Sequence, residues 1–92
     1  MAGRITISPE HVEQIAKQFK MSSEESRQIV SNLANAVQGM EHEWEGVTKQ
    51  RFIKEFQEAD KQMKSFVQIL DSISEELIAI SQKFRSIDQS HN

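Results

Sequence analysis

The sequence predicts an all-α fold, a hairpin of two long antiparallel helices that dimerises into a four-helix bundle. The chain of 92 residues has three glycines and one proline, which is too little turn-forming sequence for a fold built on strands. Apolar residues recur at steps of three and four along nearly the whole chain, the spacing of one helix face. The repeat breaks once, near Gly46, so residues 1–92 form one domain of two helices.

The first helix is expected over residues 9–43. Ser8 suits the N-cap, Pro9 the first helical position, and Glu10 the positive end of the helix dipole. Its apolar repeat consists of Val12, Ile15, Phe19, Ile29, Leu33, Ala36 and Met40, with Ser22 and Ser26 as polar members. The run Ser22-Ser23-Glu24-Glu25 also matches a capping box, so a kink followed by a restarted helix is the alternative.

The second helix is expected over residues 48–86, after a turn at residues 44–47. Gly46 suits the left-handed conformation that ends a helix, and Thr48 is a candidate N-cap for the next one. The repeat here has no polar member: Phe52, Phe56, Ala59, Met63, Phe66, Leu70, Ile73, Leu77, Ile80, Phe84 and Ile87. A polar tail is expected over residues 87–92.

The short turn makes the two helices antiparallel neighbours. Pairing the two repeats from the bend outward places Ser26 near Phe66 and Ser22 near Leu70. Small residues then face large ones, which predicts that these repeats form the seam between the two helices.

A second stripe beside this seam predicts a dimer. Ala16, Ser23, Val30, Val37 and Trp44 recur every seven residues on the first helix, and Ile53 and Val67 extend the stripe on the second. A chain of this size gains little stability from one seam, and a second apolar stripe is normally covered by another chain. We therefore expect Ala16, Val30, Val37, Ile53 and Val67 at the dimer interface; scattered surface residues on a monomer are the alternative.

Composition and motifs argue against several functions. The net charge is −3 and there is no cysteine, so neither nucleic-acid binding nor a thiolate site is expected. His42-Glu43-Trp44-Glu45-Gly46 opens like a zinc-protease helix, but Gly46 stands where the second histidine is needed. No nucleophile elbow or phosphate-binding loop is present, so we expect no catalytic residue, metal or cofactor. No run of about 18 apolar residues occurs, so no membrane span is expected, and the acidic net charge disfavours membrane contact.

Trp44 is the solitary tryptophan and lies two residues before the bend glycine. Tryptophan combines a large apolar surface with one polar donor. At this position it either closes the end of the bundle or presents a surface to a partner.

Together these residues resemble the WXG family of proteins of about a hundred residues, the early-secreted-antigen-like substrates of type VII secretion in Gram-positive bacteria and mycobacteria. The resemblance covers nearly the whole chain and includes Trp44-Glu45-Gly46 as the Trp-x-Gly turn. The family's C-terminal motif, tyrosine followed four residues later by an acid, matches Phe84 to Asp88 with phenylalanine in place of tyrosine.

The resemblance implies a non-enzymatic protein that is made in the cytoplasm and exported, without a signal peptide, as a folded dimer. Trp44, Gly46, Phe84 and Asp88 would carry recognition by a type VII secretion ATPase, and an antiparallel dimer would bring the bend of one subunit beside the C-terminal end of the other. We expect a homodimer, with a heterodimer of related hairpins as the alternative. A role as co-secretion carrier or virulence-type factor is left open.

Two other functions remain from the residues alone. The first is an intracellular helical adaptor or chaperone that binds a client through its apolar stripe. The second is a membrane-perturbing protein, which the acidic net charge disfavours because anionic lipid would repel it.

Overall fold

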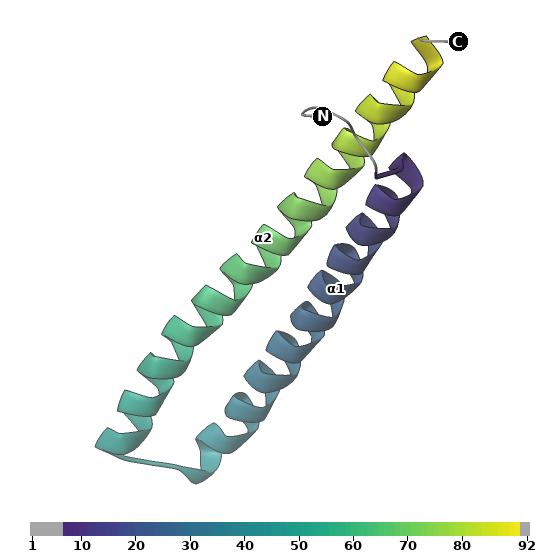
Figure 1. Cartoon of the computed structure of the whole chain (residues 1–92). Helices are drawn as coiled ribbons and strands as arrows, with labels where there is room; N and C mark the ends of the chain where they lie inside the picture. Colours follow the sequence, from purple (N-terminus) through teal and green to yellow (C-terminus); the bar gives the residue numbers. More distant parts are fainter. Residues whose placement is uncertain (1–6, 91–92) are drawn as a thin grey trace.

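The computed structural model describes the backbone of residues 7–90 and the side chains of residues 7–87. It contains α1 (Pro9–Met40), a short 3₁₀ turn η1 (Glu41–Glu43) and α2 (Val47–Ser90). The two helices form an elongated antiparallel hairpin, 70 × 22 × 17 Å (Figure 1). The helical hairpin predicted from the sequence is therefore confirmed. Within the described residues, neither helix has both the length and the apolar content needed to cross a bilayer.

Helix boundaries follow local chemistry. The Ser8 hydroxyl accepts a hydrogen bond from the His11 amide at 3.2 Å, and Pro9 is the first helical residue of α1. The second helix begins at Val47, directly after Gly46, so Thr48 lies inside the helix and is not its N-cap. α2 also continues to Ser90, where a tail from residue 87 was expected; residues 91–92 lie outside the described part.

The seam between α1 and α2 is only partly the predicted one. Val12 and Leu70 of the predicted seam are buried, but the other buried residues are small and lie on the neighbouring stripe: Ala16, Ser23 and Val30 on α1, and Val67, Ser74 and Ser81 on α2. Several large members of the predicted seam are exposed instead: Ile29, Leu33, Met40, Phe66 and Ile80. Each helix is therefore rotated about its axis so that the stripe of smaller residues faces the other helix.

The same rotation places three of the five residues expected at the dimer interface between the helices of one chain. Ala16, Val30 and Val67 are buried within one chain, and Val37 and Ile53 are half-buried there. Ala16 has no exposed surface, so it cannot contact a second chain without opening of the hairpin. Ala16, Val30 and Val67 therefore belong to the intrachain seam, whereas the place of Val37 and Ile53 at a dimer interface stays a prediction.

Size and polarity explain why the smaller stripe faces inward. Ala16 and Ser23 let the helices approach closely, whereas a side chain such as Phe66 needs more room than a two-helix contact offers. The buried hydroxyls also find partners, since Ser74 donates to the Ala16 carbonyl at 2.9 Å and Ser23 donates to Asp71. The expected register is nearly right. The sequence predicts that Ser22 lies near Leu70, and in the structure Ser23 pairs with Asp71, the next residue on each helix.

The hairpin has two unlike halves. We call residues 9–30 with residues 67–90 the terminal half, and residues 31–66 the bend half. All the buried residues named above belong to the terminal half. At the boundary the seam opens into a groove of about 540 Å³ lined by Val30, Ala34 and Val67 together with polar residues. The helices are therefore closely packed near the termini and loosely packed toward the bend.

Candidate functional site

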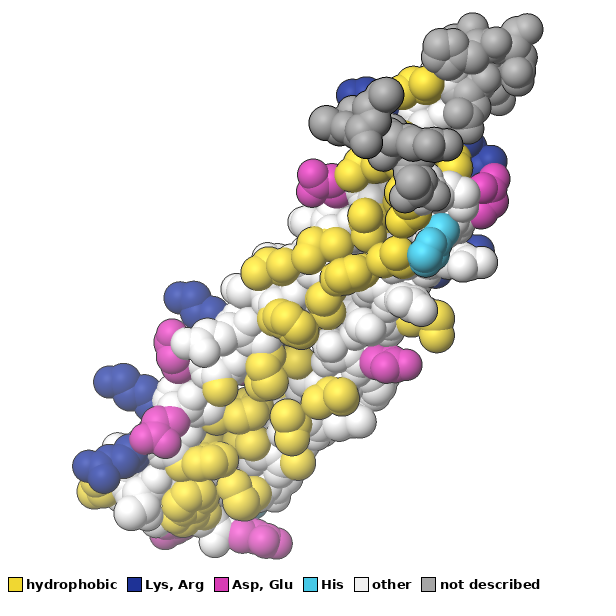
Figure 2. All heavy atoms as spheres, viewed as in Figure 1, with side chains coloured by type: hydrophobic (Ala, Val, Ile, Leu, Met, Phe, Trp, Pro, Cys, Tyr) yellow, Lys and Arg dark blue, Asp and Glu magenta, His cyan; other side chains and the backbone are white. Residues whose placement is uncertain are grey.

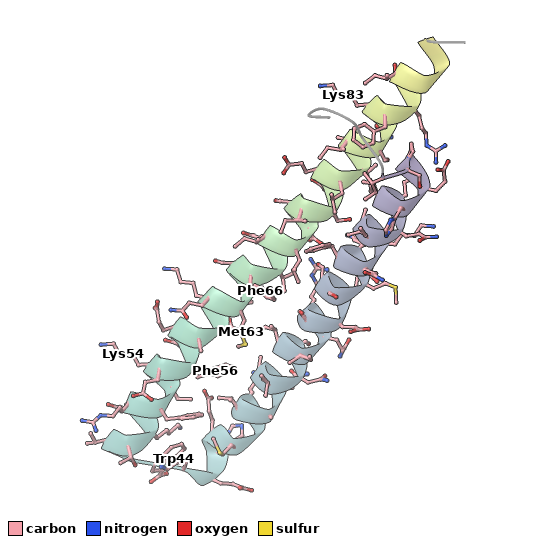
Figure 3. The ribbon with its side chains drawn as sticks, viewed as in Figure 1. Trp44, Lys54, Phe56, Met63, Phe66 and Lys83 are labelled. Atoms are coloured by element: carbon pink, nitrogen blue, oxygen red, sulfur yellow. The ribbon has the colours of Figure 1, made fainter. Side chains whose placement is uncertain are left out.

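The bend places Trp44 against the first turns of α2. Its ring lies 5.3 Å from that of Phe52, and its indole N–H donates to the Thr48 hydroxyl at 3.2 Å. Phe52 continues the contact to Phe56, with ring centres 6.5 Å apart. Figure 3 shows Trp44 at the bend, with Phe56 further along α2 on the side that adjoins α1. Trp44 is half-buried, so it both closes the bend and presents part of its ring at the surface.

Gly46 makes this turn possible. Its φ is +105°, a conformation that residues with a Cβ rarely adopt. No atom lies within 4 Å of the place where a Cβ would be, so the need for glycine comes from the backbone and not from crowding. The Gly46 carbonyl accepts the first hydrogen bond of α2, from the Gln50 amide at 3.3 Å. Trp44 and Gly46 thus have separate roles, because Trp44 supplies a surface and Gly46 supplies the turn.

A long apolar surface runs beside the intrachain seam. We call its exposed residues the open stripe: Ile29, Leu33 and Met40 on α1, and Phe66, Ile69 and Ile80 on α2. Figure 2 shows hydrophobic side chains as a continuous band over both helices along the length of the molecule. Ile29 is 56% exposed and Phe66 is 54% exposed. An apolar surface of this length is typical of a protein–protein interface.

Polar contacts join the helices beside Asp71. The Ser23 hydroxyl donates to one carboxylate oxygen of Asp71, and Arg27 donates to the other at 2.9 Å. The Lys20 ammonium lies 3.6 Å from the first oxygen. The hydrogen bond from Ser23, followed by Arg27 and the charge of Lys20, lowers the pKa of Asp71, although burial opposes the shift. The carboxylate therefore stays charged and fixes the register of the two helices.

The C-terminal end of α2 is tied to the start of α1. The Arg85 guanidinium contacts Glu13 through Nη2 at 2.6 Å and through Nε at 2.8 Å, and Glu10 through Nη1 at 3.5 Å. Glu13, through a hydrogen bond and its charge, raises the pKa of Arg85. Phe84 is half-buried. Asp88 is a residue of α2, but its side chain lies outside the described part.

The four residues expected to carry recognition do not meet within one chain. Trp44 and Gly46 lie at the bend, whereas Phe84 and Asp88 lie toward the other end of the long axis (Figure 1). Among the described side chains, no group of three or more acids and histidines is placed to hold a metal ion. The geometry supplies surfaces for protein contacts.

Sequence reasoning missed the Asp71 contacts and the exposure of the open stripe. A signal was present for the true seam, since Val67, Ser74 and Ser81 recur every seven residues. That repeat on α2 matches the one through Ala16 and Ser23 on α1. Small residues on both helices at the same spacing indicate a close helix contact.

Comparisons with known proteins agree with this geometry. The family model "WXG100: Proteins of 100 residues with WXG" matches residues 4–89. "Type VII secretion system extracellular protein A" of Staphylococcus aureus (strain USA300) is 29% identical over 85 residues, 92% of this chain and 88% of the relative. The crystal structure of the secreted protein ESXB from Bacillus anthracis is similar, with a TM-score of 0.85 and 35% identity over 92% of this chain and 90% of that one.

A further solved structure supports the fold alone. Geobacillus thermodenitrificans EsxA has a TM-score of 0.84 at 23% identity, covering 98% of this chain and 97% of that chain. The helical hairpin thus persists where sequence identity is low.

Proposed function

This chain belongs to the WXG100 family, and on that premise we propose that it leaves the cell through a type VII secretion system as a folded dimer. Relatives over most of its length are an extracellular protein of type VII secretion and a secreted protein. The chain is accordingly a type VII secreted, extracellular protein and not an enzyme.

The open stripe is the observation that supports a dimer. Its large side chains, Phe66 and Ile29 among them, lie at the surface of the single hairpin. A two-helix contact supplies little core, so a chain of this size gains stability when a second hairpin covers the apolar surface. We assign the open stripe as the dimer interface, with a second copy of this chain as the partner and a related hairpin as the alternative.

An antiparallel arrangement accounts for the two separated ends. The bend with Trp44 and the segment from Phe84 to Asp88 lie toward opposite ends of one hairpin. Two hairpins packed antiparallel through the open stripe bring the bend of one beside the C-terminal segment of the other. The secretion ATPase would then recognise a surface that only the assembled dimer presents.

Each recognition residue has a distinct role in this proposal. Trp44 supplies a partly exposed ring held by Phe52 and Thr48, and Gly46 supplies the turn that holds that ring in place. Phe84 replaces the tyrosine of the family motif, so it keeps the ring contact and lacks the hydroxyl. Asp88 supplies the acid of the family motif.

Export of single-residue variants tests the proposal. Trp44→Ala and Asp88→Ala should each reduce the protein in the culture supernatant of a strain with a type VII system, while helix content and solution mass stay nearly unchanged. Lys54→Ala is the matched control, because Lys54 points away from α1 (Figure 3) and its loss should leave export unchanged. Normal export of both Trp44→Ala and Asp88→Ala would contradict the assigned recognition residues.

The solution mass of the purified chain tests the dimer separately. Light scattering coupled to size exclusion should give about twice 10.6 kDa. A mass near 10.6 kDa for a poorly helical chain would indicate that the partner is a second, related hairpin. Cell fractionation distinguishes export from an intracellular adaptor, since only the exported protein reaches the supernatant with its N-terminus uncut.

A further inference from the structure

We propose that Arg85 is a positioning residue for the C-terminal recognition segment, residues 84–88. By binding Glu10 and Glu13 near the start of α1, Arg85 keeps the last turns of α2 helical and packed against α1. The secretion machinery recognises α2 in this form. This inference rests on the proposed function for its export consequence. The structural part, an ordered end of α2, is measurable without export.

One guanidinium spans two carboxylates. Nη2 and Nε of Arg85 both reach Oε1 of Glu13, at 2.6 and 2.8 Å, and Nη1 lies 3.5 Å from Oε1 of Glu10. Glu10 and Glu13 are separated by three residues, so their side chains lie on one face at the start of α1. The planar fork of arginine suits such a double contact, which the single ammonium of lysine cannot reproduce.

The Glu10 side of this contact is also favoured by the helix that carries it. Acids are stabilised at a helix N-terminus, and Glu10 lies in the first turn of α1. The Glu10 carboxylate is therefore stabilised at the place where it contacts Arg85.

The location of the contact gives it a specific effect. Arg85 contacts Glu10 and Glu13 near the start of α1. α2 continues to Ser90 and runs past the start of α1 (Figure 1). A helix end without a neighbouring helix frays readily. Arg85 ties α2 to α1 just before that overhang and lies between Phe84 and Asp88 in sequence, so it limits how far fraying reaches into the recognition segment.

Lys83 provides a matched control within the same turn. It is exposed, and Figure 3 shows its side chain on the side of α2 away from α1. Lys83→Gln removes the same charge as Arg85→Gln two residues away, without touching Glu10 or Glu13. Any effect of net charge on export or on helix stability therefore appears in both variants.

Hydrogen exchange of the purified, full-length protein tests the structural part. In Arg85→Gln, amides of residues 86–90 should exchange roughly two- to five-fold faster, as expected for loss of a partly exposed ion-pair network. Amides of residues 47–81 and the solution mass should not change, and Lys83→Gln should match the wild type. In 0.5 M salt the difference between wild type and Arg85→Gln should shrink, because exposed ion pairs are screened.

Export measures the functional part. Arg85→Gln should reduce export, and Arg85→Glu alone should reduce it further because Glu10 and Glu13 repel the new acid. Combining Arg85→Glu with Glu13→Arg restores a pair of opposite charges and should bring export back toward the wild-type level. A residue needed only for bulk stability would not be rescued by reversing the pair.

The outcomes separate this inference from the proposed function. The inference is overturned if amides of residues 86–90 exchange at the wild-type rate in Arg85→Gln. It is also overturned if Arg85→Gln is exported normally while Asp88→Ala is not. Normal export of Asp88→Ala overturns the recognition motif itself, and with it the export role of Arg85. Faster exchange in that last case would still establish that Arg85 orders the end of α2.

Discussion

The terminal half and the bend half of the hairpin hold their helices together in different ways. In the terminal half, buried small residues such as Ala16 and Ser23 bring the helices close. The interhelical hydrogen bonds and ion pairs described above also lie there, through Asp71, Ser74 and Arg85. In the bend half, all of which the structure describes, no residue is buried. Several of its large apolar side chains, such as Leu33 and Phe66, are exposed.

This difference means that closing the hairpin and binding a second chain depend on different residues. The terminal half closes the hairpin and fixes its register through polar contacts. The bend half leaves aromatic and aliphatic side chains available to a second chain. Substitutions of the buried residues of the terminal half should therefore affect the stability of the hairpin. Substitutions in the open stripe, which runs through both halves, should affect self-association.

The largest expected effect is the loss of the dimer on placing a charge in the open stripe. Phe66→Glu would bury an unpaired carboxylate beneath the second chain, which is strongly unfavourable. We expect self-association to weaken about 100-fold or more, measured by light scattering over a dilution series. Export should fall with it, because the composite surface needs both chains.

Met21→Glu is the control for Phe66→Glu. Met21 is also a large exposed residue, at 59%, but helical spacing from Ile29 and Leu33 places it off the open stripe. Its mass should remain that of the wild type. If Phe66→Glu stays dimeric at the concentrations at which the wild type does, the open stripe is not the dimer interface.

The next effect compares one substitution in the two halves. Ala16→Leu adds three carbons at a position with no exposed surface, so overpacking should lower the free energy of unfolding by about 1–3 kcal/mol. Ala34→Leu makes the same change on the same helix, beside the groove of about 540 Å³, and should lower it by less than about 0.5 kcal/mol. Urea unfolding at one fixed protein concentration measures both. Equal losses would mean that the bend half is packed as closely as the terminal half.

The fold was predictable from the sequence to the level of two antiparallel helices, a bend at Gly46 and a nearly correct register. Apolar spacing, one proline and one glycine at the bend determine that much. The stripe that faces inward was not predictable by hydrophobicity, because Phe66 and Ile29 are more apolar than Ser23 and Ser74 and yet lie outside. Close helix approach and hydrogen bonding of buried hydroxyls decide that choice, and both depend on three-dimensional contacts.

The candidate site was predictable only in part. Trp44 and Gly46 stand out in sequence because each is rare and the two are adjacent to the break in the repeat. Asp71 and Arg85 look like ordinary surface charges, and their partners are 48 and 72 residues away in the chain. No local pattern connects residues so far apart, so only the structure shows that they hold the helices together.

Two glycines provide a smaller test, in and near the bend. Gly46→Ala forces a Cβ into a backbone with φ of +105° and should lower the free energy of unfolding by about 1–2 kcal/mol. Gly39→Ala, in α1 with no atom within 4 Å of the added carbon, should raise it by up to about 1 kcal/mol through better helix propensity. Thermal unfolding of both variants beside the wild type measures the difference. A neutral Gly46→Ala would show that the bend relaxes freely.

The smallest expected effect is the loss of stability of the terminal half at acidic pH. The pKa of Asp71 is lowered from 3.8, first by the hydrogen bond from Ser23, so the carboxylate stabilises the fold above that value and loses this contribution as the pH falls through its lower, folded-state pKa. Asp71→Asn lacks the titrating group and should be less stable than the wild type at pH 6. The gap should narrow as the pH falls below about 3.8, because the unfolded chain then binds a proton at this position more readily than the folded protein does. Unfolding midpoints of both proteins at matched pH isolate this residue, since every other carboxylate titrates in both. A gap that stays constant down to pH 2 would mean that the Asp71 charge does not hold the terminal half closed, and that packing around Ala16 and Ser23 closes the hairpin alone.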